Sequence, residues 1–396
     1  MQDQFSMEIS PQVNMDTAVH NYYDGLAKKY RLSSKVIGIA AGVIVFLMLL
    51  LGYKEFTYEN VFYFIKDFDS VMSSGGYNID YIEYGTGENR VYYCYRGGVV
   101  AAEKYAINVY SSTGRKTATF NDGYVSPTIC VSSKYMLAYD LEGNSFSVYN
   151  SFLQLYSESL DAGIRSAYVN DRGDFLIHTS MPEYKSVVYH YNSDFERVAA
   201  YYFVDYVIKS VLSDDGKYIY ITTLGMKDGE YISTVNAYKR GEDKVSGQYC
   251  VEGALSLGCF ALNNGVCLLT DRAVIMLSNK AEVLREFEFE NNVFPRLYAV
   301  SDKGIVLVVE NETENQLMFV SSRGDTKLIP IDGDAISVDM IDSSIYILYN
   351  GAVIKYDLTN DQKLVRECPP AADDILVSSD GVVYLCYSTR AICCKF

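Results

Sequence analysis

A repeat of 36 to 47 residues runs from about position 90 to the end of the chain, and it constrains the fold more than any other feature. Each copy has an apolar strand that ends in a bulky residue and is followed by a short polar turn. The spacings between successive copies are 39, 42, 47, 39, 43 and 36 residues. The strand-end residues are Tyr110, Tyr149, Tyr191, Tyr238, Leu277, Val320 and Tyr356, and residues 391–396 (AICCKF) form an eighth copy.

A second mark precedes each of these strands, namely a tight turn and another short apolar strand. Such turns lie at residues 170–173 (NDRG), 214–216 (DDG), 263–265 (NNG), 301–304 (SDKG) and 379–381 (SDG). Asn, Asp and Gly supply the positive φ angles that hairpin turns need. A further turn and strand follow, as in residues 116–120 (KTATF). Four short antiparallel strands in about 40 residues predict one blade of a β-propeller.

The hairpins predict an all-β propeller of eight four-stranded blades, with seven blades as the alternative if one hairpin is miscounted. Two β-sandwiches are a weaker alternative, because nothing like a linker interrupts the repeat. The last blade lacks a fourth strand, since the chain ends at Phe396. We expect residues 58–66 (YENVFYFIK) to supply it, which would close the ring and leave no open sheet edge. The predicted propeller domain spans residues 54–396.

Composition agrees with a β-rich chain. The 396 residues include 37 Tyr, 18 Phe and no Trp, and Tyr favours strands. The formal net charge is −16, and the acids and bases of residues 1–35 cancel, so residues after 35 carry the whole excess. Nucleic acid is therefore a poor partner, because phosphate binding needs clustered positive charge.

One apolar run near the N-terminus predicts a membrane span. Residues 36–51 (VIGIAAGVIVFLMLLL) contain no charge, and Gly52 and Tyr53 extend the run to the lower limit of a bilayer-spanning helix. The run is apolar on all sides, unlike a surface helix of a soluble domain. We therefore expect a single transmembrane helix over residues 36–53.

The charges beside this run predict its orientation. Four basic residues precede it, and acidic residues dominate after it. The positive-inside rule then places residues 1–35 in the cytoplasm as a short tail and the propeller outside, on a single-pass protein of the cytoplasmic membrane. A cleaved signal peptide is the alternative. No A-x-A cleavage site follows the run, so an uncleaved signal anchor is expected.

The chain resembles a family of membrane-anchored β-propellers of unknown function from Gram-positive, largely anaerobic, clostridial-type bacteria. The resemblance covers nearly the whole chain and is closest over residues 124–238, which include YVSPTICVSSKYMLAYDLEGNSFSVYN and IKSVLSDDGKYIYITTLGMKDGEYISTVNAY. It implies a place on the outer face of the cytoplasmic membrane, and it brings no reaction or site residues. The likeness to WD40-like repeat propellers, such as outer-membrane assembly scaffolds and quinoproteins, is looser.

The nine cysteines show no CxxC pair and no zinc spacing. Most of them stand in apolar runs, so we interpret them mostly as core thiols. Their odd number argues against a complete disulfide framework. Free thiols outside the membrane fit a non-oxidising setting. A vicinal disulfide between Cys393 and Cys394 is not expected, because neighbouring residues of a strand point to opposite faces.

Residues with catalytic or metal-binding chemistry are sparse or explained by turns. His178 and His190 flank one predicted hairpin, and without a third ligand we interpret them as satisfied sheet histidines. Calcium at residues 170–174 is a weaker alternative, because no EF-hand loop is complete. Five pairs of Asp residues occur in or near turns: Asp67/Asp69, Asp171/Asp174, Asp214/Asp215, Asp332/Asp334 and Asp373/Asp374. The sequence therefore nominates no catalytic, cofactor-binding or metal residue and no cofactor.

The functional prediction is a non-catalytic scaffold at the cell surface that binds an envelope protein or a cell-wall polymer. The first alternative is an enzyme acting on cell-wall glycan or peptide, with acidic residues of different blades meeting at one mouth of the propeller. The second alternative is an extracytoplasmic sensor that signals through residues 1–35. Carboxylates with raised pKa values would favour the enzyme. An exposed Tyr-rich or apolar patch would favour the binding module.

Overall fold

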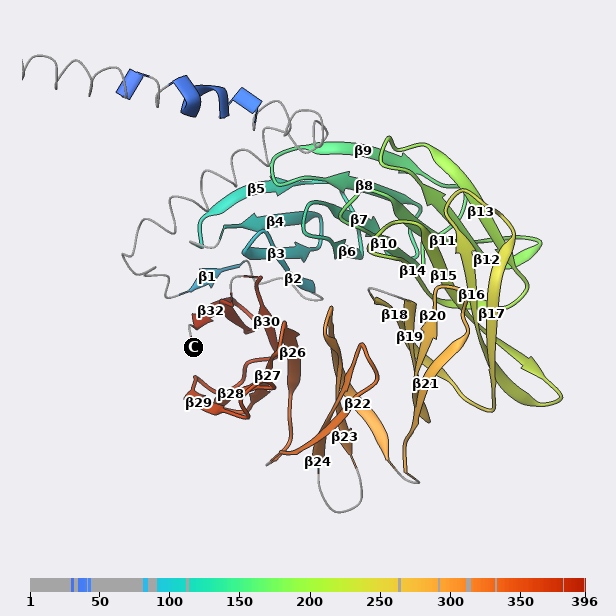
Figure 1. Ribbon diagram of the computed structural model, residues 1–396. Helices are drawn as coiled ribbons and strands as arrows, with labels where there is room; N and C mark the ends of the chain where they lie inside the picture. The colour runs from blue at the N-terminus through green and yellow to red at the C-terminus, as the bar shows by residue number, and fades with distance from the viewer. Residues whose placement is uncertain are drawn as a thin grey trace, which may run out of the picture. The chain divides into compact units, whose positions relative to one another are not determined.

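Eight small antiparallel sheets arranged around a common centre form the main body of the protein (Figure 1). We describe a computed structural model of the full chain. The chain divides into two compact units, Met1–Gly75 and Gly76–Phe396. The structure describes residues 30–31, 35–40, 42–43, 81–84, 91–111, 114–262, 265–290, 293–310, 315–331, 333–379, 381–394 and 396.

In the N-terminal unit, the described residues 30–31, 35–40 and 42–43 are helical. No helix within the described ranges is long and apolar enough to cross a membrane. Most of the predicted tail (1–35) and of the predicted span (36–53) lies outside the described residues. The transmembrane helix, its orientation and the domain boundary at residue 53 therefore stay predictions.

Each sheet of the second unit has four strands, and we number the sheets as blades 1 to 8 from the N-terminus. Blade 1 contains β2 (Val91–Tyr95), β3 (Gly98–Glu103), β4 (Ala106–Tyr110) and β5 (Lys116–Phe120). Blade 2 contains β6 (Pro127–Val131), β7 (Met136–Asp140), β8 (Ser145–Tyr149) and β9 (Gln154–Ser159). Blade 3 contains β10 (Ser166–Val169), β11 (Phe175–Met181), β12 (Tyr184–Tyr191) and β13 (Arg197–Phe203). Blade 4 contains β14 (Tyr206–Leu212), β15 (Tyr218–Lys227), β16 (Glu230–Lys239) and β17 (Val245–Glu252).

The second half of the unit repeats this order. Blade 5 contains β18 (Ser256–Leu262), β19 (Gly265–Thr270), β20 (Ala273–Ser278) and β21 (Val283–Glu288). Blade 6 contains β22 (Phe294–Ser301), β23 (Gly304–Glu310), β24 (Asn315–Ser321) and β25 (Thr326–Pro330). Blade 7 contains β26 (Ser337–Ile341), β27 (Ser344–Tyr349), β28 (Ala352–Asp357) and β29 (Lys363–Glu367). Blade 8 contains β30 (Asp374–Val377), β31 (Val383–Cys386), β32 (Arg390–Cys394) and β1 (Ile82–Glu83).

The predicted eight-bladed propeller is confirmed, and the chain order inside each blade explains the ring. The first strand of each blade lies innermost. Inner strands of neighbouring blades contact one another from β2 through β6, β10 and β14 to β18, and again from β22 through β26 to β30. Contact between β30 and β2 joins the last blade to the first. The repeat of the sequence is therefore one blade per copy.

Ring closure uses a different segment from the one that the sequence predicted. The fourth strand of blade 8 is β1, where Ile82 pairs with Ala391 and Glu83 with Arg390. Residues 58–66, which we expected in this place, lie outside the described residues. The expectation that a segment before the first repeat completes the last blade is confirmed. The predicted segment was wrong because residues 58–66 form a long apolar stretch that resembles a strand, whereas a strand of two residues leaves no recognisable pattern in the sequence.

Burial follows the position of a strand within its blade. All six residues of β19, a second strand, are buried, whereas all five residues of β29, an outer strand, are exposed. Six of the seven strand-end residues are buried to within 5% exposure, and Tyr356 is half-buried. The third strand of each blade thus carries the bulky residue that packs against the preceding blade, as the repeat indicates.

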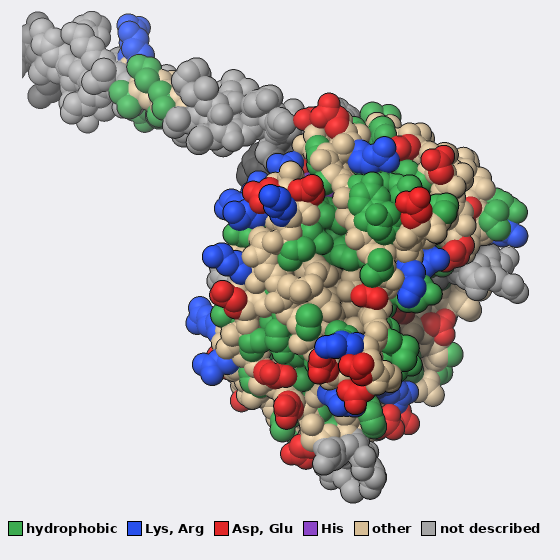
Figure 2. Space-filling model, turned by 90° about the vertical axis from the view of Figure 1, so that its right-hand side faces the viewer, with side chains coloured by type: hydrophobic (Ala, Val, Ile, Leu, Met, Phe, Trp, Pro, Cys, Tyr) green, Lys and Arg blue, Asp and Glu red, His purple; other side chains and the backbone are tan. Residues whose placement is uncertain are grey.

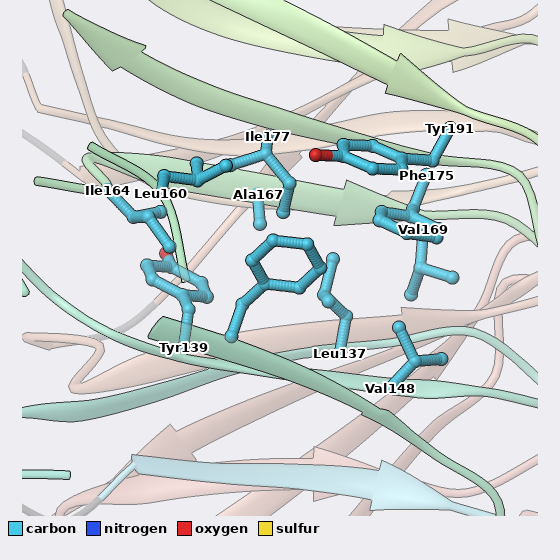
Figure 3. Packing of buried hydrophobic residues seen from close by; sticks show 11 residues of the cluster. Leu137, Tyr139, Val148, Leu160, Ile164, Ala167, Val169, Phe175, Ile177 and Tyr191 are labelled. Carbon is cyan, nitrogen blue, oxygen red and sulfur yellow. The ribbon is translucent and has the colours of Figure 1, made fainter. Parts of the chain in front are cut away.

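Packing between blades 2 and 3 shows how the core is built (Figure 3). Leu137 and Val148 of blade 2 face Phe175, Ile177 and Tyr191 of blade 3. The rings of Phe175 and Tyr191 are stacked, with centroids 4.6 Å apart. Each fully buried side chain of this size contributes about 1.5–3 kcal/mol relative to exposure. Faces packed in this way hold each blade in place through its neighbours.

Candidate functional site

The connections between strands fall into two sets at opposite ends of the blades. Because neighbouring strands run antiparallel, the connection from the second to the third strand lies at the same end as the connection to the next blade. We call this end the loop face. The opposite end carries the connections from the first to the second strand and from the third to the fourth, and we call it the turn face.

Short polar turns that bond to their own backbone build the turn face. Asn170 Oδ1 accepts hydrogen bonds from the N–H groups of Arg172 and Asp174, each at 3.0 Å. The pattern recurs at Ser321, whose Oγ accepts a bond from Asp325 N–H at 2.9 Å. These turns satisfy themselves, so their polar residues serve turn geometry as the sequence predicted.

The first pair of predicted turn carboxylates links blades rather than forming one site. Asp171 Oδ1 accepts a hydrogen bond from Ser133 N–H of blade 2 at 2.6 Å. Asp174 has a side chain only 1% exposed and accepts a bond from Arg240 of blade 4 at 2.7 Å. Burial raises the pKa of Asp174, and Arg240 opposes that shift. The two carboxylates therefore hold blade 3 to its neighbours on either side.

The second pair, Asp214 and Asp215, occupies one turn of blade 4. Burial, followed by the charge of Asp171, raises the pKa of Asp214. Burial acts in the same direction on Asp215, but hydrogen bonds from Lys217 and Ser213 outweigh it and bring its pKa to about 2. Asp215 accepts those bonds from Ser213 Oγ at 2.7 Å and Lys217 N–H at 3.0 Å. This pair is part of a turn.

The remaining carboxylates are scattered or lie outside the described residues. Asp334 is exposed and accepts a hydrogen bond from Asn315 Nδ2 at 3.1 Å. Asp373 is also exposed, on the connection before β30. Residues of these pairs outside the described ranges are Asp67, Asp69 and Asp332.

Near the centre of the propeller, two carboxylates come from neighbouring inner strands, and sequence reasoning had considered only one of them. Asp339 of β26 accepts bonds from Val377 N–H at 2.7 Å and Met340 N–H at 2.8 Å. Asp374 of β30 accepts a bond from Ser337 Oγ at 2.5 Å. Burial raises the pKa of Asp339 to about 6. Each carboxylate bonds across to the other strand, so this arrangement joins β26 and β30.

His178 and His190 lie on β11 and β12 with their side chains on one face of the sheet, because His178 pairs with Val188 and His190 with Leu176. They are 3% and 0% exposed, and burial lowers the pKa of each to about 4. His178 Nδ1 is 3.2 Å from Ser166 Oγ. His190 makes no hydrogen bond among the described residues, so the prediction of satisfied histidines is wrong for His190.

The described residues offer neither a metal-binding cluster nor a disulfide. No group of three or more His, Cys, Asp or Glu side chains there could hold a metal ion, including the turn at 170–174. None of the nine cysteines forms a disulfide, Cys393 and Cys394 included. Three are buried, five are half-buried and Cys250 is exposed, so core thiols describe only part of the set. Burial raises the pKa of the Cys267 thiol, which makes it a poor nucleophile.

A group of exposed apolar side chains stands on the loop face of blades 3 and 4. We call it the blade 3–4 patch, and it consists of Met181, Tyr202, Val204, Tyr206, Met226 and Tyr231, whose exposed fractions lie between 41% and 69%. The Tyr202 ring lies 4.9 Å from that of Tyr184, and Met226 pairs with Tyr231 across β15 and β16. Large apolar groups in contiguous exposed positions mark binding surfaces.

The hairpin of β15 and β16 extends the patch outward. Both strands have 10 residues, the longest in the propeller. They are joined by Asp228 and Gly229, which both have positive φ, as a two-residue hairpin turn requires. The signal for this projection is in the sequence, since the 47-residue spacing between Tyr191 and Tyr238 is the longest of the repeat. Which side chains would gather there was not predictable from spacing.

Acidic residues surround the patch. Glu183, Asp205, Asp228, Glu230 and Glu252 lie on the connections and strand ends beside it. Two lysines stand among them, and each has a neighbour: Lys185 Nζ lies 4.9 Å from the Tyr206 ring, and Lys227 Nζ lies 3.8 Å from Glu252. Figure 2 views the molecule from the right-hand side of Figure 1 and shows hydrophobic side chains in groups with acidic ones around them. An apolar centre with an acidic rim suits a partner with an apolar centre and a basic rim.

This architecture is that of an eight-bladed β-propeller. The chain belongs to a family of unknown function (DUF5711), whose model matches residues 76–388. A comparison with curated proteins finds no match. The Gram-positive origin and the membrane attachment implied by the resemblance stay predictions.

Several solved propellers have the same fold. Sqt1 of Saccharomyces cerevisiae is 10% identical, with a TM-score of 0.58 over 81% of this chain and 99% of that one. BamB of Moraxella catarrhalis is 10% identical, with a TM-score of 0.54 over 80% and 99% of the two chains. A eukaryotic initiation factor is 12% identical, with a TM-score of 0.52 over 78% and 87%. Identities this low show the fold alone.

Proposed function

We propose that this protein is a non-catalytic scaffold whose propeller binds another protein through the blade 3–4 patch. One observation carries the proposal: the described loop face gathers six large apolar side chains in one place, whereas polar turns that bond to their own backbone recur on the described turn face. Tyr and Met are the residue types enriched at the centres of protein interfaces. Met also adapts its shape to a partner.

The acidic rim defines the partner's chemistry. The chain carries a net charge of −16, and acids outnumber lysines around the patch. We therefore expect a protein partner with an apolar centre flanked by Lys or Arg. Complementary charge of this kind speeds association and excludes acidic competitors.

We further propose that residues 36–53 hold the propeller at the outer face of the cytoplasmic membrane. The uncharged run 36–51 and the basic residues before it support this location. Anchoring raises the local concentration of the propeller near envelope proteins, so a modest affinity suffices for binding. Fusing a reporter enzyme to the C-terminus and testing its accessibility in intact cells measures the orientation. Activity confined to the cytoplasm would contradict it.

The enzyme alternative has less support. Asp339 has the raised pKa that a catalytic acid needs. Its two oxygens, however, accept backbone N–H bonds, and Asp374 bonds to Ser337. These contacts give the carboxylates a structural role, so we propose no reaction for them.

Site-specific photo-cross-linking on the full chain tests the proposal. A photoreactive phenylalanine analogue is placed at Tyr206 or Met226 in the patch and, as matched controls of similar exposure, at Leu153 or Val283 away from it. The expected result is one reproducible protein adduct from the patch positions alone. The combined substitution Tyr206→Ser and Met226→Ser should weaken capture about 30-fold, as loss of two central side chains does at other interfaces. Equal adducts from control positions, or none at all, would contradict the proposal.

A further inference from the structure

A second feature, independent of the proposed protein-binding surface, is a cavity between blades 1 and 2. Its volume is 360 Å³. One wall is the connection from β5 to β6, which carries Asp122 and Tyr124, and the other is the outer half of blade 2. Small-molecule pockets span roughly 300–1,000 Å³, so this one has room for a ligand of one or two rings.

The cavity exists because blade 2 has small side chains at a position that other blades fill. Two residues before the strand-end residue, blade 2 pairs Ser147 with Ser157 across β8 and β9. Blade 4 has Asn236 and Gln248 at the same place, bonded to each other at 2.8 Å. Serines leave a gap where an Asn and a Gln close it.

Blade 1 also has larger side chains than blade 2 at this position. Its equivalent pair is Asn108 and Thr119, and Thr119 Oγ1 donates to Asn108 Oδ1 at 2.9 Å. Blade 2 adds a second serine pair, Ser145 and Ser159, whose hydroxyls lie 2.8 Å apart. The space in blade 2 is therefore a local departure from the repeat and not a property of every blade.

Hydroxyls in fixed positions line the cavity. Tyr124 and Ser147 are 5% and 3% exposed, and their hydroxyls bond at 2.9 Å. Gln154 Nε2 donates to Ser147 Oγ at 3.4 Å. Tyr149, fully buried behind the cavity, donates to the carboxylate of Asp122. These bonds hold donors and acceptors in place before any ligand arrives, which lowers the entropy cost of binding.

The chemistry of the lining narrows the ligand class. Among the described residues no Lys or Arg lines the cavity and the carboxylate of Asp122 does, so phosphate and other anions are disfavoured. The lining is rich in hydroxyls that both donate and accept, with one carboxylate, that of Asp122, that accepts only. Its aromatic residues offer little apolar surface to a lysine stem or a lipid, because Tyr124 is 5% exposed and the ring of Phe146 packs on the other face of the sheet, against Phe175 and Tyr191 of blade 3. Neutral ligands with many hydroxyl groups match such a surface best.

We propose that this cavity binds one sugar residue of a glycan. Hydroxyl groups of the sugar would donate to Asp122 and exchange hydrogen bonds with the serines and Gln154. The opening of the cavity lies beside the exposed residues Ser157 and Ser159 of the outer strand β9, so neighbouring sugars of a longer chain would continue along the rim.

Ligand-observed saturation-transfer NMR on the full chain tests this site. The probes are the neutral disaccharides cellobiose, maltose and diacetylchitobiose at millimolar concentration. Nα-acetyl-lysine amide, whose side-chain ammonium is charged, serves as the cationic comparison. Ser157→Gln introduces the side chain that fills the position in blade 4. Thr119→Gln, at the equivalent exposed position of blade 1, is the matched control.

The expected result is saturation transfer to at least one disaccharide, with affinity at least tenfold lower in the Ser157→Gln variant and unchanged in the Thr119→Gln variant. No transfer to any disaccharide, equal transfer with Ser157→Gln, or preference for the lysine amide would overturn the proposal. Far-ultraviolet circular dichroism of both variants separates loss of binding from loss of fold. Cross-linking at the blade 3–4 patch is unaffected by this result, so the two proposals fail separately.

Discussion

The two faces of the propeller are made by the same strands and behave differently. On the turn face, side chains of Asn and Ser bond to their own turns, and Asp171 and Asp174 join neighbouring blades. On the loop face, the described connections expose Val204, Tyr206 and other apolar groups. In this propeller, contacts on the turn face hold neighbouring blades together, whereas the loop face presents exposed apolar side chains.

Close backbone approaches also distinguish the turn face. A Cβ atom at Gly265, the first residue of β19, would overlap the carbonyl oxygen of Leu277. The same overlap would arise at Gly98 with Tyr110 O and at Gly304 with Val320 O. In three blades, therefore, the strand-end carbonyl packs against a glycine. The loop-face glycine Gly229 has nothing within 4 Å of such an atom.

Substituting a glycine on each face should give the largest change in stability and tests the difference between the two faces. Gly265→Ala should lower the free energy of unfolding by about 4 kcal/mol, because the backbone of β20 has to move. Gly229→Ala, with a φ of +88° but open space, should lower it by about 1 kcal/mol through backbone strain alone. Urea unfolding followed by tyrosine fluorescence measures both. Equal losses of unfolding free energy in the two variants would contradict the difference between the two faces.

Ion pairs on the two faces give the next largest effect. Arg240→Met on the turn face leaves the buried carboxylate of Asp174 without its cation, which should lower the free energy of unfolding by about 3 kcal/mol. Lys227→Met on the loop face removes an exposed pair with Glu252, at a cost of about 0.5 kcal/mol or less. The measurement is again urea unfolding at neutral pH. A larger loss for the loop-face variant would contradict the assignment of the turn face as the rigid end.

Acidification should loosen the boundary between blades 3 and 4 near the turn face. The folded pKa of His190 is lowered to about 4, below the ordinary value of 6.5, so the unfolded chain binds the proton first. Stability from this group is complete above pH 6.5 and is lost as the pH falls toward 4. Between pH 7.5 and 5 the loss is about 2 kcal/mol for one such histidine.

His190→Leu isolates that contribution, because neither ring nitrogen makes a hydrogen bond to a described residue that the substitution would break. The variant should lose about 2 kcal/mol less than the wild type between pH 7.5 and 5. Asp339 acts in the opposite sense in both proteins, since its folded pKa is raised to about 6 and its ionisation destabilises the fold as the pH rises from 3.8 to 6. Parallel stability curves for the two proteins would rule out the histidine mechanism.

Much of the fold was predictable because its signals are local. Turn residues such as Asp214 and Gly216, and the period of the apolar strands, act over a few positions, so they identify eight blades without knowledge of contacts. The closing strand was not predictable in the same way. Ile82 and Glu83 form a strand only because the free edge of β32 is there to pair with them.

The candidate site depended still more on tertiary structure. By itself, the sequence determined the repeat, the strand-end residues and the extra length between Tyr191 and Tyr238, since each is a property of neighbouring residues. Only the tertiary structure decided which exposed side chains meet in the blade 3–4 patch, and that Ser147 and Tyr124 bond to each other in the lining of a cavity. Both arise between blades, where residues far apart in the chain come together and no local pattern reports their distance.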